Sequence, residues 1–458
     1  MRLWSFIRET MLRYPNQVIS ESDANLSYES MVVFAEQFSQ RLKKEKSCAI
    51  LCSSEMASAM ALLSCFAAGV TAIPLSFRYG SVHCNKILNR IQPTAVITDI
   101  DGGLKILNIS DFCYKEPEDP PALIMCTSGT TGTPKGVMLS EQNVRTNVKD
   151  ICEYFKLSSK DSIFIARPLY HCAVLTGEFL VGLMNGCQIR FYSEKFHPKE
   201  ILESIEKHQI SVFCGTPTML SLMARIQKKE NLSCLKKIAI SGECMSKETG
   251  KRIAQAFSNA AIYHVYGLTE ACPRVSWLPP NLFLENADAV GIPLFSVTLK
   301  ILKENNRPAS QGEKGILWIK GQSVMMGYYD DPQATERVLK GGWLCTGDIA
   351  MIDEHGFLKI KGRSDDLIIR GGMNIYPAEV ESALKIDDRV KDVFVYSFVH
   401  PLTGVELGMK ISGDFHSKEE IQKICDEYLP SYQRPSKIEF VDELPKNESG
   451  KIRREKAN

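Results

Sequence analysis

The chain has 458 residues, more than one hydrophobic core usually supports, so two or more folding units are expected. Lysine and arginine number 55 against 54 aspartates and glutamates, which excludes a strong overall field of the kind that gathers nucleic acid or anionic lipid. The 15 cysteines are scattered, odd in number and never spaced as CxxC. Reduced, mostly buried thiols are therefore favoured over disulfides or a zinc site.

Two segments near the N-terminus bear on the compartment. Residues 1–17 carry charges among their apolar residues, so they lack the core of a secretory signal and are expected to form an amphipathic surface helix. Residues 56–77 contain no charge, but Gly69 and Pro74 interrupt them. We expect a buried helix that runs into a strand, with membrane insertion as the less favoured alternative. A cytoplasmic protein without a transmembrane segment follows.

Between about residues 120 and 270, short β-branched runs alternate with helical patterns, which is typical of parallel βαβ units. The predicted strands are residues 122–126, 162–166, 210–214, 237–240 and 261–265, and residues 198–208 have helical spacing. Ligands of open parallel sheets bind beyond the carboxyl ends of the strands. Polar or glycine-containing loops follow all five runs, so we expect these loops to converge on one rim.

Beyond residue 315 the pattern changes to alternating strands at 316–320 and 357–361, followed by a small α+β pattern. Ser417 and Glu420 are spaced as a capping box before a helix that ends near Leu429.

The fold class predicted from these patterns is α/β, in two domains. Residues 1–362 are expected to form a large N-terminal domain of layered α/β subdomains with parallel sheets. Residues 367–458 are expected to form a small α+β lid. The polar residues 363–366 are the candidate hinge between them.

The segment TSGTTGTPKG, residues 127–136, follows a predicted apolar strand. Backbone N–H groups and hydroxyls of such a loop can cradle a triphosphate, with Lys135 balancing its charge; an ordinary surface turn is the alternative. It is not a Walker loop, because Pro134 stands where that loop needs its second glycine. The predicted phosphate ligands are Thr127, Ser128, Gly129, Thr130, Thr131, Gly132 and Lys135.

This segment stands in order with YGLTE (266–270), WLCTGD (343–348), Gly362-Arg363 and LPKNESGK (444–451). Together they resemble the acyl-adenylate-forming superfamily of acyl- and aryl-CoA ligases, peptide-synthetase adenylation domains and luciferase, with acid–CoA ligases the most similar. The resemblance runs from about residue 26 to 454. It implies an AMP-forming carboxylate ligase that makes an acyl-adenylate from a carboxylate and Mg-ATP and then passes the acyl group to a thiol.

The resemblance assigns roles to the YGLTE segment, which includes Gly267. Tyr266 would stack on adenine, Thr269 would contact phosphate and Glu270 would help to hold Mg²⁺. The chemistry agrees, since magnesium prefers oxygen ligands shared with substrate phosphates. A structural ion pair is the alternative for Glu270.

Three further roles are implied by the resemblance. Asp348 would accept hydrogen bonds from both ribose hydroxyls, which a carboxylate with two acceptor oxygens suits, and Arg363 would also reach the ribose. Lys451 would bridge the substrate carboxylate and the α-phosphate, unless residues 446–456 are only a solvated basic tail. His171, in PLYH, would line the entrance for carboxylate and thiol, although a lone histidine is more often structural.

The lid is expected to pivot at Asp365 between the two half-reactions. The glycine pair 371–372 resembles the pair beside the pantetheine channel of acid–CoA ligases. Glu141, His264, Ile369 and the pair 243–244 depart from the common pattern and weaken any transfer of substrate identity.

The expected substrate is a fatty or aryl acid. Peptide-synthetase domains commonly place an aspartate beside the segment aligned with Tyr170-His171, and none stands here, so amino acids should be rejected. The expected pocket residues are mostly small and apolar: Cys172, Val174, Cys214, Cys244, Leu268, Ala271 and Cys272.

Coenzyme A is the expected acceptor, and the phosphopantetheine of an acyl carrier protein is the alternative, because both present the same thiol. Three other classes compete with this reading. They are a nucleotide-binding sensor without turnover, an amino-acid-loading module and a luciferase-like oxygenase.

Overall fold

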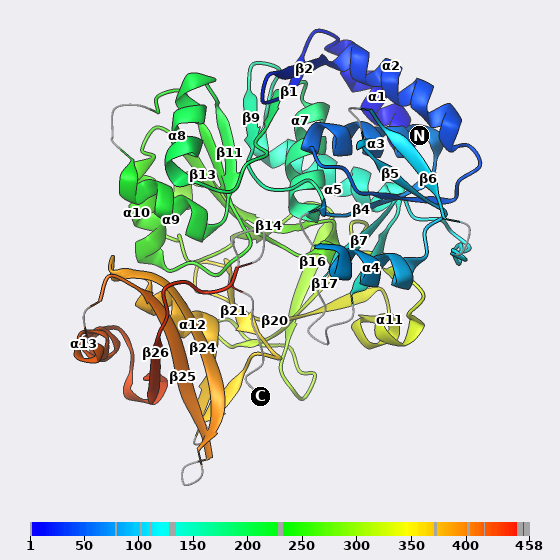
Figure 1. Cartoon of the computed structure of the whole chain (residues 1–458). Helices are drawn as coiled ribbons and strands as arrows, with labels where there is room; N and C mark the ends of the chain where they lie inside the picture. The colour runs from blue at the N-terminus through cyan, green and yellow to red at the C-terminus, as the bar shows by residue number, and fades with distance from the viewer. Residues whose placement is uncertain are drawn as a thin grey trace.

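The computed structural model describes residues 2–77, 80–100, 103–109, 112–127, 134–227, 232–370, 373–400, 404–415, 417–446 and 452. A large body contains three sheets, and a smaller domain with two small sheets of its own lies against one end of it (Figure 1).

The first large sheet has seven strands in the order β18-β8-β7-β4-β3-β5-β6. Their bounds are β3 (Ser47–Ile50), β4 (Thr71–Pro74), β5 (Ala95–Thr98), β6 (Lys105–Asn108), β7 (Leu123–Thr127), β8 (Lys135–Leu139) and β18 (Gly327–Tyr328). Strands β5, β3, β4 and β7 are parallel, whereas β6, β8 and β18 pair antiparallel with their neighbours. Helices α2 (Tyr28–Ser39), α3 (Glu55–Ala68) and α4 (Gly80–Ile91) belong to this part of the chain.

The second large sheet has nine strands in the order β15-β14-β13-β12-β11-β9-β10-β1-β2. Their bounds are β1 (Val18–Glu21), β2 (Ala24–Ser27), β9 (Ser162–Ile165), β10 (Gln188–Phe191), β11 (Val212–Gly215), β12 (Lys237–Ile240), β13 (Ala261–Gly267), β14 (Arg274–Leu278) and β15 (Ile292–Pro293). The strands from β1 to β13 in this order are parallel. Helices α5 (Glu141–Phe155), α8 (Pro198–Lys207), α9 (Pro217–Ile226) and α10 (Lys247–Ala256) accompany it.

One sequence prediction is wrong here. Four of the five predicted strands are β9, β11, β12 and β13 of the nine-stranded sheet, but residues 122–126 form β7 in the other sheet. The strand before the predicted phosphate loop therefore belongs to a different sheet from the other four strands. Periodicity identifies a strand but not its partner, and β7 pairs with β8 over Leu123–Thr127.

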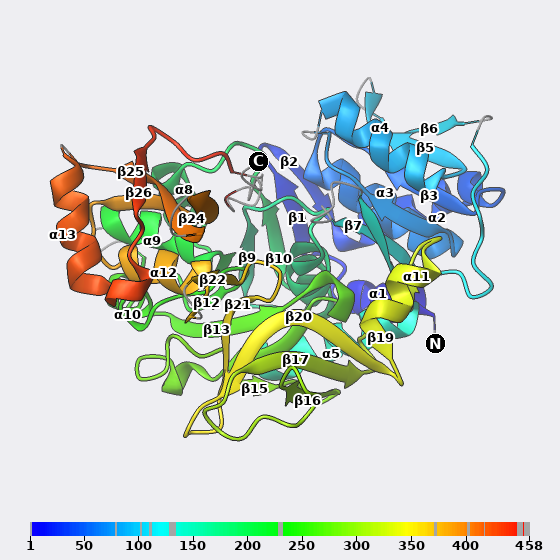
Figure 2. The ribbon, with the colours of Figure 1, turned by 90° about the horizontal axis from the view of Figure 1, so that it is seen from below.

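The third sheet is antiparallel and connects the body to the smaller domain. It contains β16 (Val297–Leu302), β17 (Gly315–Gly321), β19 (Leu339–Lys340), β20 (Trp343–Ile352) and β21 (Leu358–Arg363), with α11 (Pro332–Val338) before β19. Figure 2 shows the small domain on the side of α9 and α10, and α11 on the opposite side of this sheet.

The small C-terminal domain has an α+β fold, which we call the lid. Its elements are β22 (Ile368–Arg370), β23 (Met373–Ile375), α12 (Pro377–Leu384), β24 (Val390–His400), β25 (Gly404–Gly413), α13 (Lys418–Tyr428) and β26 (Lys437–Phe440). Ser417 accepts a hydrogen bond from the Glu420 N–H at the start of α13, so the predicted cap position is confirmed.

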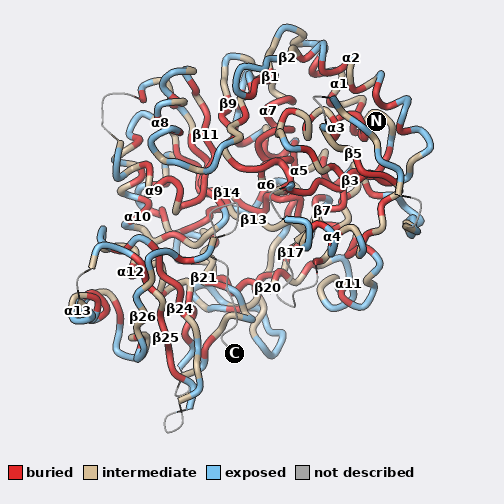
Figure 3. Tube along the Cα trace, viewed as in Figure 1, coloured by how far each residue is buried: buried red, intermediate tan, exposed pale blue. Residues whose placement is uncertain are grey.

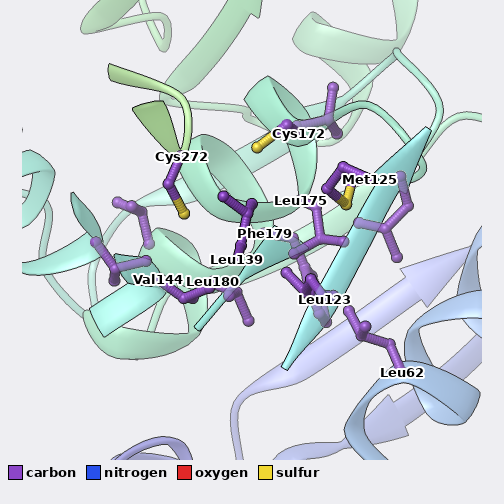
Figure 4. Packing of buried hydrophobic residues seen from close by; sticks show 14 of the residues in the cluster. Leu62, Leu123, Met125, Leu139, Val144, Cys172, Leu175, Phe179, Leu180 and Cys272 are labelled. Atoms are coloured by element: carbon purple, nitrogen blue, oxygen red, sulfur yellow. The ribbon is translucent and has the colours of Figure 1, made fainter. Parts of the chain in front are cut away.

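The apolar core of the body is shared between the two large sheets. Figure 4 shows this packing at Leu123, Met125 and Leu139 of the seven-stranded sheet against Leu175 and Phe179. The lid has a separate core, and Figure 3 shows it as a second buried zone along β24 and β25. Each unit therefore buries its own apolar surface.

The secondary structure predicted for residues 1–17 and 56–77 is confirmed. Residues 3–13 form the helix α1 (Leu3–Arg13), which buries one face, and residues 56–77 form most of α3 followed by β4. No helix within the described ranges is long and apolar enough to cross a bilayer. All the cysteines are free, and most of them are buried.

Candidate active site

Three predicted nucleotide residues from separate parts of the chain meet at the end of β13. The hydroxyl of Tyr266 donates a hydrogen bond to Oδ2 of Asp348, and Nη1 of Arg363 donates to Oδ1 of Asp348 at 3.2 Å. Asp348 and Arg363 face each other because β20 and β21 pair in that register. Nη1 of Arg363 also donates to the carbonyl oxygen of Thr346 at 2.9 Å.

The carboxylate of Asp348 is buried, and its surroundings set its acidity. Burial raises the pKa of Asp348, while the guanidinium of Arg363 and the hydroxyl of Tyr266 oppose this shift. Burial and the nearby carboxylate also raise the pKa of Tyr266, so this hydroxyl remains a hydrogen-bond donor. The arrangement holds one acceptor group in a defined orientation at the strand end.

A second group forms around Tyr328, a residue that the sequence analysis missed. The hydroxyl of Tyr328 donates to Oε1 of Glu270 at 2.9 Å, and Nζ of Lys135 lies 4.8 Å from the centroid of the Tyr328 ring. Tyr328 belongs to β18, which pairs with β8 opposite Val137. Tyr328 thus links the phosphate-loop strand of one sheet to the Glu270 loop of the other.

The Glu270 loop is a tight turn between β13 and β14. A Cβ at Gly267 would lie 1.7 Å from the carbonyl oxygen of Pro273, so no side chain fits there. Thr269 starts a short 3₁₀ turn, and the Glu270 carbonyl accepts from the Met325 N–H at 2.9 Å. These contacts keep Thr269 and Glu270 at the rim of the nine-stranded sheet.

A cleft of about 490 Å³ lies beside Lys135. Its lining residues are Arg90, Pro134, Lys135, Gly136, Tyr328, Tyr329, Asp331 and Arg337. Three of these side chains are cationic and one is acidic, so the cleft suits an anion. Thr127 pairs with Lys135 across β7 and β8, at the mouth of the predicted phosphate loop.

His171 lies after β9 and directly before α6 (Cys172–Val174). Its ring lies 4.2 Å from that of Tyr170, centroid to centroid. Asp365 follows β21, and its half-exposed carboxylate is 3.5 Å from Nε of Arg363. The predicted residues Lys451, Ser128, Gly129, Thr130, Thr131 and Gly132, and the glycine pair 371–372, lie outside the described residues.

The sequence matches the AMP-binding enzyme family over residues 7–329 and the C-terminal domain of AMP-binding enzymes over residues 379–451. The chain belongs to the AMP-binding enzyme family. The superfamily and the fold class predicted from the motifs are thereby confirmed, since the solved relatives have the same fold.

Similar members of the AMP-binding family bear the names of CoA ligases. The chain is 33% identical to a long-chain-fatty-acid–CoA ligase of Haemophilus influenzae over 76% of its own length and 64% of that enzyme. It is 31% identical to a 2-succinylbenzoate–CoA ligase of Bacillus velezensis over 91% of its own length and 88% of that enzyme. It therefore spans less than two thirds of the first relative and most of the second.

A solved structure of an AMP-binding enzyme gives the same picture of the fold. The o-succinylbenzoate CoA synthetase of Bacillus subtilis, in complex with its acyl-adenylate intermediate, superposes with a TM-score of 0.85 and 25% identity. The superposition covers 99% of this chain and 97% of that one.

Proposed function

We propose that this chain is an AMP-forming carboxylate–CoA ligase. It converts a carboxylic acid and Mg-ATP to an acyl-adenylate and pyrophosphate, and coenzyme A then displaces AMP. The family and the names of its relatives confirm the predicted reaction class and the predicted use of ATP, Mg²⁺ and coenzyme A. The single observation that carries the residue assignment is the junction of Tyr266, Asp348 and Arg363.

In this proposal the Asp348 group binds the ribose. Its carboxylate is already oriented by Tyr266 and Arg363, and the remaining lone pairs can accept from the two ribose hydroxyls. Because the donors are in place before the nucleotide arrives, little reorganisation is needed on binding. The adenine would stack on the Tyr266 ring.

Glu270 fits a shared magnesium site. One of its oxygens accepts from Tyr328, which leaves the other for the ion, and the described residues contain no cluster of three or more metal-ligating side chains. Mg²⁺ commonly takes one or two carboxylates, with substrate phosphates and water completing its shell. Bound there, the ion would neutralise phosphate charge. Thr269, Lys135 and the 127–132 loop would hold the phosphates.

Formation of the acyl-adenylate requires a cation near the α-phosphorus, because negative charge accumulates there as the carboxylate attacks. The substrate carboxylate oxygen attacks the α-phosphorus, pyrophosphate leaves, and Lys451 stabilises the charge that concentrates between them. In the second half-reaction the thiolate of coenzyme A attacks the acyl carbon and AMP leaves. His171, at the N-terminus of α6, would line the entrance through which both acyl group and thiol approach.

The lid would serve both half-reactions by rotating at a hinge in residues 363–366, with 1–362 as the body and 367–458 as the lid. Asp365 follows the last body strand, β21, and precedes β22 of the lid. A few backbone torsions at such a position are enough to move a whole domain.

The substrate class in the proposal is a fatty or aryl acid, and relatives named for a long-chain fatty acid, 2-succinylbenzoate and ferulate support it. Coenzyme A is the acceptor, with a carrier-protein phosphopantetheine as the alternative. A cytoplasmic location belongs to the proposal as well, because the free cysteines suit a reducing compartment.

The test is acid-dependent exchange of labelled pyrophosphate into ATP, with a panel of fatty, aryl and amino acids. Free coenzyme A and a phosphopantetheinylated carrier protein are then supplied separately, and thioesters are quantified by mass spectrometry. Exchange with a fatty or aryl acid and formation of its CoA thioester are expected. Absence of exchange with every acid would favour a nucleotide-binding sensor without turnover. Thioester formation on the carrier protein alone would show that the carrier, and not coenzyme A, is the acceptor.

A further inference from the structure

A buried charged cluster lies near Cys214, one of the residues expected from the sequence to line a mostly apolar acid pocket. Arg167 lies two residues after the end of β9, Glu178 lies on the π-helical turn η4 (Leu175–Leu180), and Arg274 begins β14. Their exposed fractions are 6%, 1% and 2% respectively. The charges of all three side chains act on the thiol of Cys214.

The cluster has more cations than anions. Arg167 forms an ion pair with Glu178, and burial raises the pKa of Glu178 while Arg167 opposes the shift. No carboxylate of the described residues forms an ion pair with Arg274; its guanidinium has a side-chain hydrogen bond with the neutral Tyr154 hydroxyl, and its Nε has no hydrogen-bond partner among those residues. Whether Glu178 is ionised or protonated, the cluster carries at least one positive charge in excess. A buried charge without a counter-ion is costly.

The guanidinium of Arg274 lies against the helical segment that follows His171 and Cys172. A Cβ added at Gly177 would lie 3.2 Å from Nη2 of Arg274, so the guanidinium rests against backbone that carries no side chain. Thr176, the preceding residue, donates through Oγ1 to the carbonyl oxygens of Cys172 at 2.8 Å and Cys272 at 3.4 Å. Cys172 and Cys272, two of the expected pocket residues, interact with each other and belong to the buried apolar cluster (Figure 4).

The separation between His171 and the cluster along the helix is comparable to the length of a medium-chain acid. His171 and Gly177 are six residues apart along α6 and η4, which corresponds to roughly 9 Å of helix. A π-helical turn inside a helix is often found at functional sites. An acid whose reacting carboxylate lies near His171 would therefore extend toward Arg274.

We infer, on the basis of the proposed function, that Arg274 determines specificity by binding a second anionic group at the far end of the acid. The preferred substrates are then dicarboxylic acids rather than plain alkyl acids. Arg167 and Glu178 act as positioning residues, because their ion pair leaves Arg274 as the cation available to the substrate. A guanidinium suits this task since it can bind a carboxylate through two parallel hydrogen bonds.

The test compares matched acids that differ only in the terminal group: hexanoate with adipate, and octanoate with suberate. The measured quantity is the ratio of kcat/KM for diacid over monoacid in pyrophosphate exchange. We expect the wild type to prefer the diacid, and Arg274→Met to lower the ratio by about 10- to 100-fold, the scale of one charge-assisted contact. Arg307→Gln, at an exposed turn, is the control and should leave the ratio unchanged.

Glu178→Gln provides a second variant with the opposite expected sign. Removal of the carboxylate leaves two guanidinium groups, so the preference for the diacid should rise. A purely structural cluster would instead lower melting temperature and activity with all acids, without changing the ratio. If Arg274→Met does not fold, the ratio in Glu178→Gln decides: an increase supports the inference, and no increase overturns it.

The outcomes separate this inference from the proposed function. Exchange that favours monoacids in the wild type, with a ratio unchanged by Arg274→Met, overturns the role of Arg274 and leaves the ligase intact. Absence of exchange with every acid overturns the ligase itself.

Discussion

The body and the lid are held together by different physical means. Inside the body, the two large sheets share one apolar core, whereas the lid encloses a core of its own and meets the body through polar contacts. Arg252 of α10 forms an ion pair with Asp388 and donates to the carbonyl oxygen of Lys385 at 2.8 Å, next to the end of α12. Arg225 of α9 donates to the carbonyl oxygen of Val390 at 2.9 Å.

This difference indicates which parts of the molecule can move. Separating the two large sheets would expose apolar surface to water, which is costly, but polar contacts between body and lid can be exchanged for water at little net cost. In the proposed mechanism, Tyr266, Asp348 and Glu270 of the body bind the nucleotide and Lys451 acts from the lid. ATP binding would then stay fixed while the lid changes its contribution between half-reactions.

The largest effect is expected from Lys451→Ala, which removes the contribution of the lid to the first half-reaction. Adenylation should slow by about 10²–10³, the scale of one lost charge-stabilising donor. Thiolysis of preformed acyl-adenylate should survive. Rapid-quench measurement of each half-reaction checks this, and equal loss of both would show that the lysine is structural.

Asp365→Pro should impair the second half-reaction and spare the first, which is the reverse of the effect expected for Lys451→Ala. Proline fixes φ at the proposed pivot, so thioester formation should fall by about 10² while adenylation retains most of its rate. Asp365→Ala, which removes the same carboxylate but leaves φ free, is the matched control for loss of the side chain. Unchanged overall turnover in Asp365→Pro would remove the hinge from the account.

Asp348→Asn is a change within the body and should affect nucleotide binding alone. Loss of the charged acceptor should raise KM for ATP by about 30-fold and leave KM for the acid nearly unchanged. Asp288→Asn, which breaks an ion pair with Lys359 elsewhere on the body, is the control. An equal rise in both KM values would contradict a ribose-specific role.

The pH dependence of this site follows from the same residue. Burial raises the pKa of Asp348 above that of a free aspartate, so the carboxylate is protonated at a higher pH than usual. ATP affinity should therefore be full above that raised pKa and decline as the pH falls through it. Titration of KM for ATP against pH checks the decline, which should be absent in Asp348→Asn.

The smallest effect is expected from Arg252→Gln, which weakens one polar contact between lid and body. The ratio of the rates of the two half-reactions should change by about threefold, because the substitution shifts only the relative populations of the lid positions. Arg252→Lys, which keeps the charge for the ion pair with Asp388, should change the ratio less than Arg252→Gln. Equal change of both half-reactions in Arg252→Gln would show that the contact does not bias the lid.

The parts of the fold that could be predicted were those with a strong local pattern. The strand at 237–240 was predicted with its observed bounds, and the helix at 198–208 differs from α8 by one residue. Tyr266, Asp348 and Arg363 could be selected because they stand in ordered motifs, and the structure brings them into contact.

The remainder depended on pairing that no local pattern specifies. Tyr328 lies in a strand of two residues, whose role comes from pairing with β8 across the sheet. Arg167 and Arg274 are 107 residues apart, and only the packing of η4 beneath them shows a charged cluster beside the pocket. Residues 122–126 were assigned to the wrong sheet for the same reason, because their sequence pattern does not specify which strand they pair with.

The most direct test of the account follows the oxygen atoms of the acid. The acid is labelled with ¹⁸O in its carboxyl group and incubated with Mg-ATP and coenzyme A in unlabelled water, and the products are analysed by mass spectrometry. Attack of the carboxylate on the α-phosphorus predicts that AMP carries one labelled oxygen and that the thioester retains the other. Unlabelled AMP, or ADP in place of AMP, would contradict the formation of an acyl-adenylate.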